Sequence, residues 1–171
     1  DNSKPTVVLV HGSGLDHRCW ALQARWFAFH GYSVFAPDLP GHSLSKGKPL
    51  DSIEAMGKWL VDALDSAGAT SIHLVGHSMG FLIALEAANL LEGRLKTLTA
   101  VASAESIPVN EDLVTTAKSS AAAAAGLMLK WGFGSTAQFG VSAVPGMQPI
   151  AIGRQIMSDN PLAIDLKACQ A

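Results

Sequence analysis

Apolar positions along the chain follow two periods, one typical of buried strands and one typical of helices. Short apolar runs rich in β-branched residues predict buried strands, and they occur at 6–10, 33–36, 72–75 and 95–102. Segments with an apolar residue every three or four positions predict helices between the strands, at 20–30, at 53–67 and from 79 to about 91. Strands that alternate with helices form a parallel sheet with right-handed crossovers, so the pattern predicts an α/β fold.

The alternation of strands and helices stops near Val109. Asn110 is expected to cap a helix, and two further helical segments meet at Asn160-Pro161 after a loop rich in Gly and Ser. The sequence therefore divides into a predicted partial α/β core at residues 1–107 and a predicted helical segment at residues 108–171.

A Gly-x-Ser-x-Gly pattern stands at residues 76–80, where an apolar strand run passes into a helical pattern. This setting is typical of a nucleophile elbow, a tight turn that projects a serine hydroxyl into a cleft. Gly76 and Gly80 leave out side chains that would collide where the strand and the helix approach each other. Ser78 is therefore the candidate catalytic nucleophile, and the alternative is an ordinary glycine turn.

A second loop of small residues, His11-Gly12-Ser13-Gly14, follows the first predicted strand. A loop at the carboxyl end of a parallel strand can direct a backbone N–H at developing negative charge, and the residue after the nucleophile can supply a second one. The backbone N–H groups of Ser13 and Met79 are therefore predicted to form an oxyanion hole. His11 is interpreted as a residue that packs within the loop.

A third motif, Asp38-Leu39-Pro40-Gly41-His42-Ser43, follows the second predicted strand. With these three motifs in this order, the chain resembles the α/β-hydrolase superfamily and, within it, the capped serine esterases. The resemblance implies a serine hydrolase that cleaves small-molecule carboxylic esters through an acyl-enzyme, without a cofactor or a metal. It also implies that the helical segment at 108–171 is a cap over the site.

The catalytic histidine and acid are the weak part of this resemblance. In the family the order along the chain is nucleophile, acid, histidine, yet no histidine follows His77. His77 lies next to Ser78 and is expected to point away from it, and the other histidines are interpreted as structural, namely His17, His30, His42 and His73. The resemblance makes Glu105 a candidate acid, with a solvated hinge carboxylate as the alternative.

Two further carboxylates are not assigned to catalysis. Asp38 is interpreted as a structural loop residue, and Asp165 as a surface or capping residue. Because the resemblance covers four of the usual eight strands, we expect the chain to be truncated at both ends. The enzyme would then be active in its complete form, and the alternatives are a non-catalytic binding module of the same fold or an inactive fragment.

Composition limits the remaining function classes. The chain has 171 residues, of which 49% are hydrophobic, and it can therefore bury a core. A net charge of -2 argues against a nucleic-acid partner, and no apolar stretch is as long as a bilayer span. The expected location is cytoplasmic, Cys19 and Cys169 are expected to be free thiols, and the oligomeric state is left open.

Overall fold

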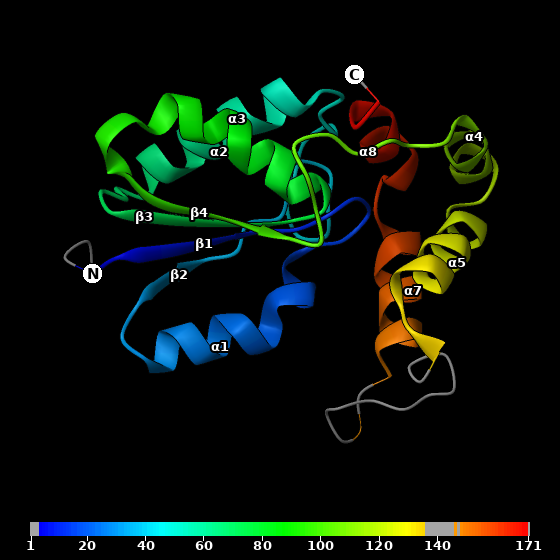
Figure 1. Ribbon diagram of the computed structural model, residues 1–171, viewed down its shortest axis with the longest axis horizontal. Helices are drawn as coiled ribbons and strands as arrows, with labels where there is room; N and C mark the ends of the chain where they lie inside the picture. The colour runs from blue at the N-terminus through cyan, green and yellow to red at the C-terminus, as the bar shows by residue number, and fades with distance from the viewer. Residues whose placement is uncertain (1–3, 136–145, 147, 171) are drawn as a thin grey trace.

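A parallel sheet organises the first hundred residues of the protein. The computed structural model describes residues 4–135, 146 and 148–170. Its sheet has four strands in the order β2-β1-β3-β4 (Figure 1), and all three neighbouring pairs are parallel. The strands are β1 (Thr6–Val10), β2 (Ser33–Phe35), β3 (Ile72–His77) and β4 (Leu95–Val101). This architecture confirms the predicted partial α/β fold.

The two central strands place the candidate motifs at one edge of the sheet. Val7, Val8, Leu9 and Val10 are at most 2% exposed, as expected for a strand covered on both faces. The register of β1 against β3 runs from Thr6 opposite Ile72 to Val10 opposite Gly76. Because both strands are parallel and in register, the loop after β1 and the turn after β3 leave the sheet side by side.

Helices cover both faces of the sheet. Figure 1 shows α1 (Ala21–Phe29) on one face, with α2 (Ile53–Ser66) and α3 (Met79–Leu91) on the other. The helix predicted at 20–30 is confirmed as α1, and a short 3-10 turn, η1 (His17–Trp20), precedes it. The turn starts early because the side chain of Asp16 accepts a hydrogen bond from the backbone N–H of Arg18 and caps it. A second 3-10 turn, η2 (Glu92–Arg94), links α3 to β4.

After a loop at 102–110, the rest of the described chain is mostly helical, and its helices lie beyond the ends of the strands toward which the arrows point in Figure 1. Its elements are α4 (Glu111–Ser119), α5 (Ala121–Gly132), α7 (Pro149–Asp159) and α8 (Leu162–Ala168). The Asn110 side chain accepts a hydrogen bond from Asp112 N at 2.7 Å, which confirms the predicted cap of α4. Residues 136–145, 147 and 171 of the predicted helical segment lie outside the described residues, and its boundary at 107/108 stays a prediction.

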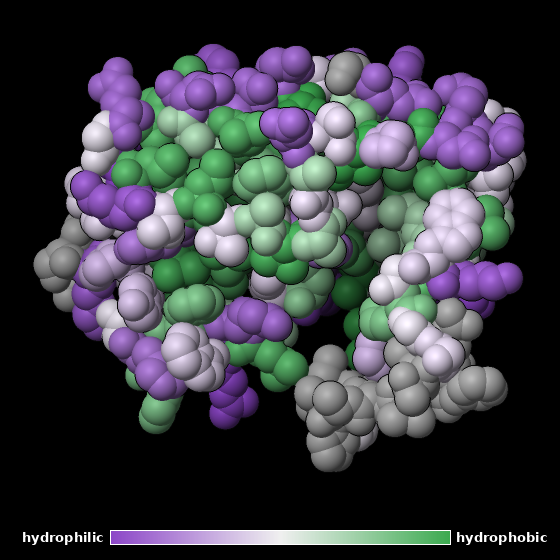
Figure 2. Space-filling view, viewed as in Figure 1, coloured by the Kyte–Doolittle hydropathy of each residue, from purple (hydrophilic) through white to green (hydrophobic). Residues whose placement is uncertain are grey.

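Three apolar clusters hold these parts together. One lies between the sheet and the helices α2 and α3, and a second joins α4, α5, α7 and α8 with Leu15 from the loop after β1. The third packs Trp20 against Val7 and Leu9 of β1. Figure 2 shows apolar side chains on the face that carries α3 and β4, where Leu90 and Val101 are exposed. Within the described residues, no helix is both long enough and apolar enough to cross a bilayer.

Candidate active site

Ser78 occupies a strained turn between β3 and α3. Its backbone angles are φ 52° and ψ -124°, in a region that residues with a side chain rarely adopt. The turn is held from outside, because Ser78 N donates to Val101 O at 3.0 Å and Ser103 Oγ donates to Ser78 O at 2.9 Å. The end of β4 and the loop after it therefore fix the backbone of the candidate nucleophile.

The two glycines of the motif allow this turn to pack closely. A Cβ atom at Gly76 would collide with the backbone of Gly80 and Phe81. A Cβ atom at Gly80 would collide with the carbonyl oxygen of Val10 and would lie 2.6 Å from that of His11. These separations put the start of α3 in direct contact with the end of β1, in the arrangement that a nucleophile elbow requires.

The loop His11–Gly14 lies against Ser78. A Cβ atom at Gly12 would lie 3.2 Å from Ser78 Cβ and 3.1 Å from His77 O. Met79 is the first residue of α3, so its N–H has no partner within the helix. The described residues provide no hydrogen-bond partner for the N–H of Ser13 either. Two donor groups are thus available on either side of the serine.

His11 supports this loop from within. It is fully buried, its Nε2 accepts a hydrogen bond from Leu39 N at 3.3 Å, and its Nδ1 lies 3.0 Å from Gly12 O. Those partners require a neutral ring with the proton on Nδ1. Burial lowers the pKa of His11, which favours the same neutral form. Both ring nitrogens are occupied, in agreement with a packing role.

The interpretation of Asp165 as a surface or capping residue is wrong, because its side chain is completely buried. Its Oδ2 lies 2.9 Å from Nε2 of His42, which is 1% exposed. His42 Nδ1 lies 3.3 Å from Pro40 O, so both ring nitrogens act as donors. Burial alone would lower the pKa of His42, but the Asp165 carboxylate outweighs it and the pKa is raised. Both ring nitrogens of His42 are thus engaged within the chain, and neither is left for Ser78.

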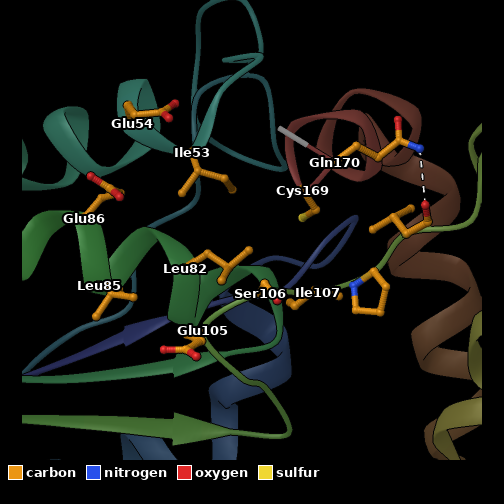
Figure 3. Close-up of a pocket in the computed structure, with 12 residues that line it drawn as sticks. Ile53, Glu54, Leu82, Leu85, Glu86, Glu105, Ser106, Ile107, Cys169 and Gln170 are labelled. Atoms are coloured by element: carbon orange, nitrogen blue, oxygen red, sulfur yellow. Dashed lines mark hydrogen bonds between the residues drawn. The ribbon is translucent and has the colours of Figure 1, made fainter.

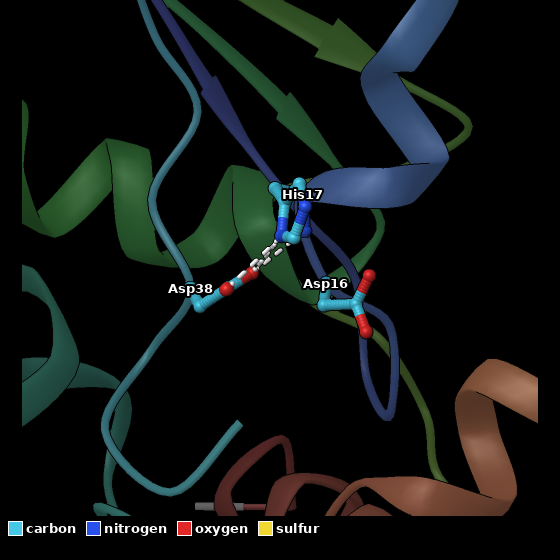
Figure 4. Close-up of side chains that lie close together, drawn as sticks. All are labelled: Asp16, His17 and Asp38. Atoms are coloured by element: carbon cyan, nitrogen blue, oxygen red, sulfur yellow. Dashed lines mark hydrogen bonds and ion pairs between the residues drawn. The ribbon is translucent and has the colours of Figure 1, made fainter. Parts of the chain in front are cut away.

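A second pair joins His17 to Asp38. Figure 4 shows the two side chains facing each other, with His17 Nδ1 at 2.8 Å from Asp38 Oδ1. Asp16 lies close enough for the three residues to share a metal ion in principle. However, its carboxylate already accepts hydrogen bonds from Arg18 and Asn160. This cluster is therefore explained by interactions within the chain.

The remaining histidines also have structural surroundings. His77 packs edge-on against Trp20 with ring centroids 6.4 Å apart, and burial lowers its pKa. Nδ1 of His73 lies 2.9 Å from Oγ1 of Thr97, and Nδ1 of His30 lies 2.7 Å from the carbonyl oxygen of Trp26. None of the described histidines makes a hydrogen bond to the Ser78 hydroxyl.

Glu105, the candidate acid, is exposed in the loop after β4. It lines a cleft of about 550 Å³ together with Glu54 and Glu86 and with apolar residues that include Leu82 and Ile107 (Figure 3). Ser78 is not among the residues that line this cleft. The role of Glu105 as the acid stays a prediction.

Comparison of the sequence with family profiles assigns the chain to a family. The profile of the alpha/beta hydrolase family matches residues 7–164, which include the strand–turn–helix around Ser78 and the loop beside it. The chain belongs to the alpha/beta hydrolase family. The relatives and solved structures that it resembles are mostly described as hydrolases or esterases.

Two relatives and one solved structure show what this alpha/beta hydrolase is similar to. An (E)-2-((N-methylformamido)methylene)succinate hydrolase of Acinetobacter baylyi is 33% identical over 45% of the chain and 29% of its own length. A pimeloyl-[acyl-carrier protein] methyl ester esterase of Methylococcus capsulatus is 34% identical over 56% of the chain and 35% of its own. The fold of an Exiguobacterium antarcticum esterase matches 98% of the chain and 66% of that structure, with a TM-score of 0.80 at 17% identity. The chain thus spans only part of each relative.

The buried carboxylate of Asp16 gives this alpha/beta hydrolase a specific sensitivity to acid. Burial alone would raise the pKa of Asp16, but hydrogen bonds from Arg18 and Asn160 lower it to about 2 from 3.8. A lowered folded-state pKa stabilises the protein above the unfolded value, and this contribution disappears as the pH falls through the folded value. We expect the wild type to lose about 2 kcal/mol of unfolding free energy between pH 5 and pH 2 that Asp16→Asn does not lose.

Urea unfolding of both proteins at a series of pH values measures this difference. Asp159→Asn serves as the control, because Asp159 is exposed and should follow the wild type. Parallel pH dependence of wild type and Asp16→Asn would contradict the prediction.

Proposed function

We propose that Ser78 is the nucleophile of a hydrolase that cleaves small-molecule carboxylic esters through an acyl-enzyme. The observation that carries this proposal is the strained turn of Ser78, which holds the residue against the loop His11–Gly14. A serine in this position can present its hydroxyl next to two backbone N–H groups that have no other described partner. The esterases among the relatives support the choice of an ester as substrate.

In the proposed reaction Ser78 Oγ attacks the ester carbonyl carbon while a histidine takes its proton. The N–H groups of Ser13 and Met79 donate to the carbonyl oxygen as it becomes an oxyanion. The loss of one such donor typically costs on the order of 10²–10³ in rate. The alkoxide then leaves with the proton from the histidine, and water attacks the acyl-enzyme to release the acid and restore Ser78.

None of the histidines whose contacts are described above makes a hydrogen bond to the Ser78 hydroxyl, as this reaction requires. Both nitrogens of His11 and His42 are engaged, and His77 packs against Trp20. We therefore propose that the base comes from a part of the protein beyond these 171 residues, with Glu105 as a candidate acid. The alternative is a binding module of the same fold without turnover, and the occupied histidine nitrogens favour it.

Hydrolysis of a short p-nitrophenyl ester tests both functions. We expect the 171-residue chain to hydrolyse the ester slowly, near the roughly 10³–10⁴-fold acceleration over water that remains when a triad is broken. A longer form, encoded with the flanking DNA and carrying a later histidine, should show turnover that Ser78→Ala removes. Ser66→Ala, an exposed serine at the end of α2, is the matched control and should leave the rate unchanged.

Each outcome selects one function. Fast Ser78-dependent turnover by the chain as given would show that a base is present, and His17→Gln would then be tested first because its Nδ1 is already held by Asp38. Turnover without dependence on Ser78 in either form would contradict the proposed nucleophile. Inactivity of both forms would favour the binding module.

A further inference from the structure

We propose that Asp165 is a positioning residue for the loop His11–Gly14, which it fixes through the backbone N–H of Gly14 and through His42. The inference rests on the proposed function, in which Ser13 N–H in this loop stabilises the oxyanion. It is supported by two hydrogen bonds of Asp165, one with Gly14 and one with His42. These bonds join α8 to the loops after β1 and β2, which lie more than a hundred residues earlier in the chain.

The contact of Asp165 with Gly14 fixes the N–H side of this residue, whose carbonyl oxygen accepts a hydrogen bond from Asn160 Nδ2 at 3.1 Å. Gly14 N donates to Asp165 Oδ2 at 2.7 Å, a short bond to a charged acceptor. Gly14 has φ +67°, a left-handed conformation among many that glycine can adopt. The bond sets the orientation of the Ser13–Gly14 peptide group. Because the N–H of Ser13 belongs to the preceding peptide group, Gly12–Ser13, the bond restrains that N–H through the backbone of Ser13.

One face of α8 covers the loop at successive helical positions. Leu162, Asp165 and Cys169 stand three and four residues apart, so their side chains share one face. Leu162 Cδ1 would lie 2.8 Å from a Cβ atom at Gly14, and Cys169 Sγ lies 3.8 Å from Ser13 Oγ. Asp165 therefore meets the loop at the centre of a packed contact that excludes water.

His42 brings the loop after β2 to the same carboxylate. Oδ2 of Asp165 receives hydrogen bonds from both Gly14 N and His42 Nε2, and the His42 ring lies 5.0 Å from that of His11. A buried carboxylate is costly unless it is paired, and the His42 ring provides the pairing. The other oxygen, Asp165 Oδ1, is buried without a hydrogen-bond partner among the described residues. Such an orphan atom lowers stability.

Amide hydrogen exchange tests the positioning without any need for turnover. In the wild type the N–H of Gly14 should be protected from exchange, since it donates to a buried carboxylate. In Asp165→Asn we expect Gly14 exchange to accelerate by about 10- to 100-fold, with a smaller increase at Ser13. The amides of Leu74 and Val75 in β3 should exchange as before, and Asp159→Asn should resemble the wild type throughout.

Reaction with a fluorophosphonate adds a readout specific to catalysis. In this reaction Ser78 Oγ bonds to phosphorus, fluoride leaves and the hydroxyl proton passes to the base or to solvent. We expect Asp165→Asn to lower the limiting rate of labelling at saturating fluorophosphonate by at least about 10-fold. The fluorophosphonate concentration that gives half of the limiting rate should not change. Absence of labelling in the wild type would contradict the proposal that Ser78 is the nucleophile. It would not contradict the positioning role of Asp165, which the hydrogen-exchange experiment tests separately.

Three results would overturn the positioning role. The first is an unprotected Gly14 amide in the wild type, which requires no variant and therefore applies even if Asp165→Asn fails to fold. The second is unchanged Gly14 exchange in Asp165→Asn. The third is an equal acceleration at Gly14 and in β3, which would show that Asp165 contributes only to global stability.

Discussion

Gly80→Ala should unfold the protein or lower its unfolding free energy by more than about 4 kcal/mol. The added methyl group would collide with the carbonyl oxygen of Val10 and lie 2.6 Å from that of His11. Both oxygens belong to the central strand of the sheet and to the loop that follows it, so neither can move without loss of strand pairing. Circular dichroism and urea unfolding of the purified variant measure the effect.

Gly132→Ala is the matched control for this prediction. Gly132 ends α5 with open space around the position of a Cβ atom. Alanine there should be neutral or stabilise the helix by up to about 1 kcal/mol. A Gly80→Ala protein within about 1 kcal/mol of the wild type would mean that α3 and β1 are farther apart than the structure shows.

Asn160→Ala should cost at least about 3 kcal/mol of unfolding free energy. Its side-chain N–H groups lie 3.1–3.2 Å from four acceptors, and its Oδ1 accepts from Ser43 N at 2.9 Å. The four acceptors are Gly14 O, Leu15 O, Asp16 Oδ2 and Ile156 O. Alanine would leave these buried groups without the amide that joins α7 to the loops after β1 and β2.

Urea unfolding compares this variant with Asn89→Ala, an exposed residue on α3. The control should change stability by less than about 0.5 kcal/mol. We also expect the Asn160→Ala and Asp16→Asn changes to be non-additive, because the two side chains are hydrogen-bonded to each other. Additive effects would show that the contact contributes little.

The sheet and the turn at Ser78 could be predicted from the sequence because their signals are local. The bounds of β1 and α3 agree with the predicted ones, since a β-branched run and a three-to-four-residue period each need only a few neighbouring residues. The glycines at 76 and 80 likewise reveal a close approach that lies within their own turn.

The contacts of Asp165 and Asn160 could not be predicted in the same way. Apart from Ile156 O, their partners lie between residues 14 and 43, so only the tertiary structure shows that these polar side chains are buried. A polar residue in a helical segment is ordinarily exposed, which is why the sequence pattern favours a surface position for Asp165. One signal was present, since Asp165 shares a helix face with Leu162 and Cys169, and an aspartate on an apolar face needs a buried partner.

The backbone of Ser78 bears on how selection acts on this protein. A residue with a side chain in such a conformation costs of order 1–3 kcal/mol, and glycine at the same position would relieve most of that cost. A lineage that gained nothing from the hydroxyl would be more stable with glycine there, and a single base change in some serine codons gives that substitution. Drift toward glycine at position 78 would therefore mark descendants that no longer need the serine.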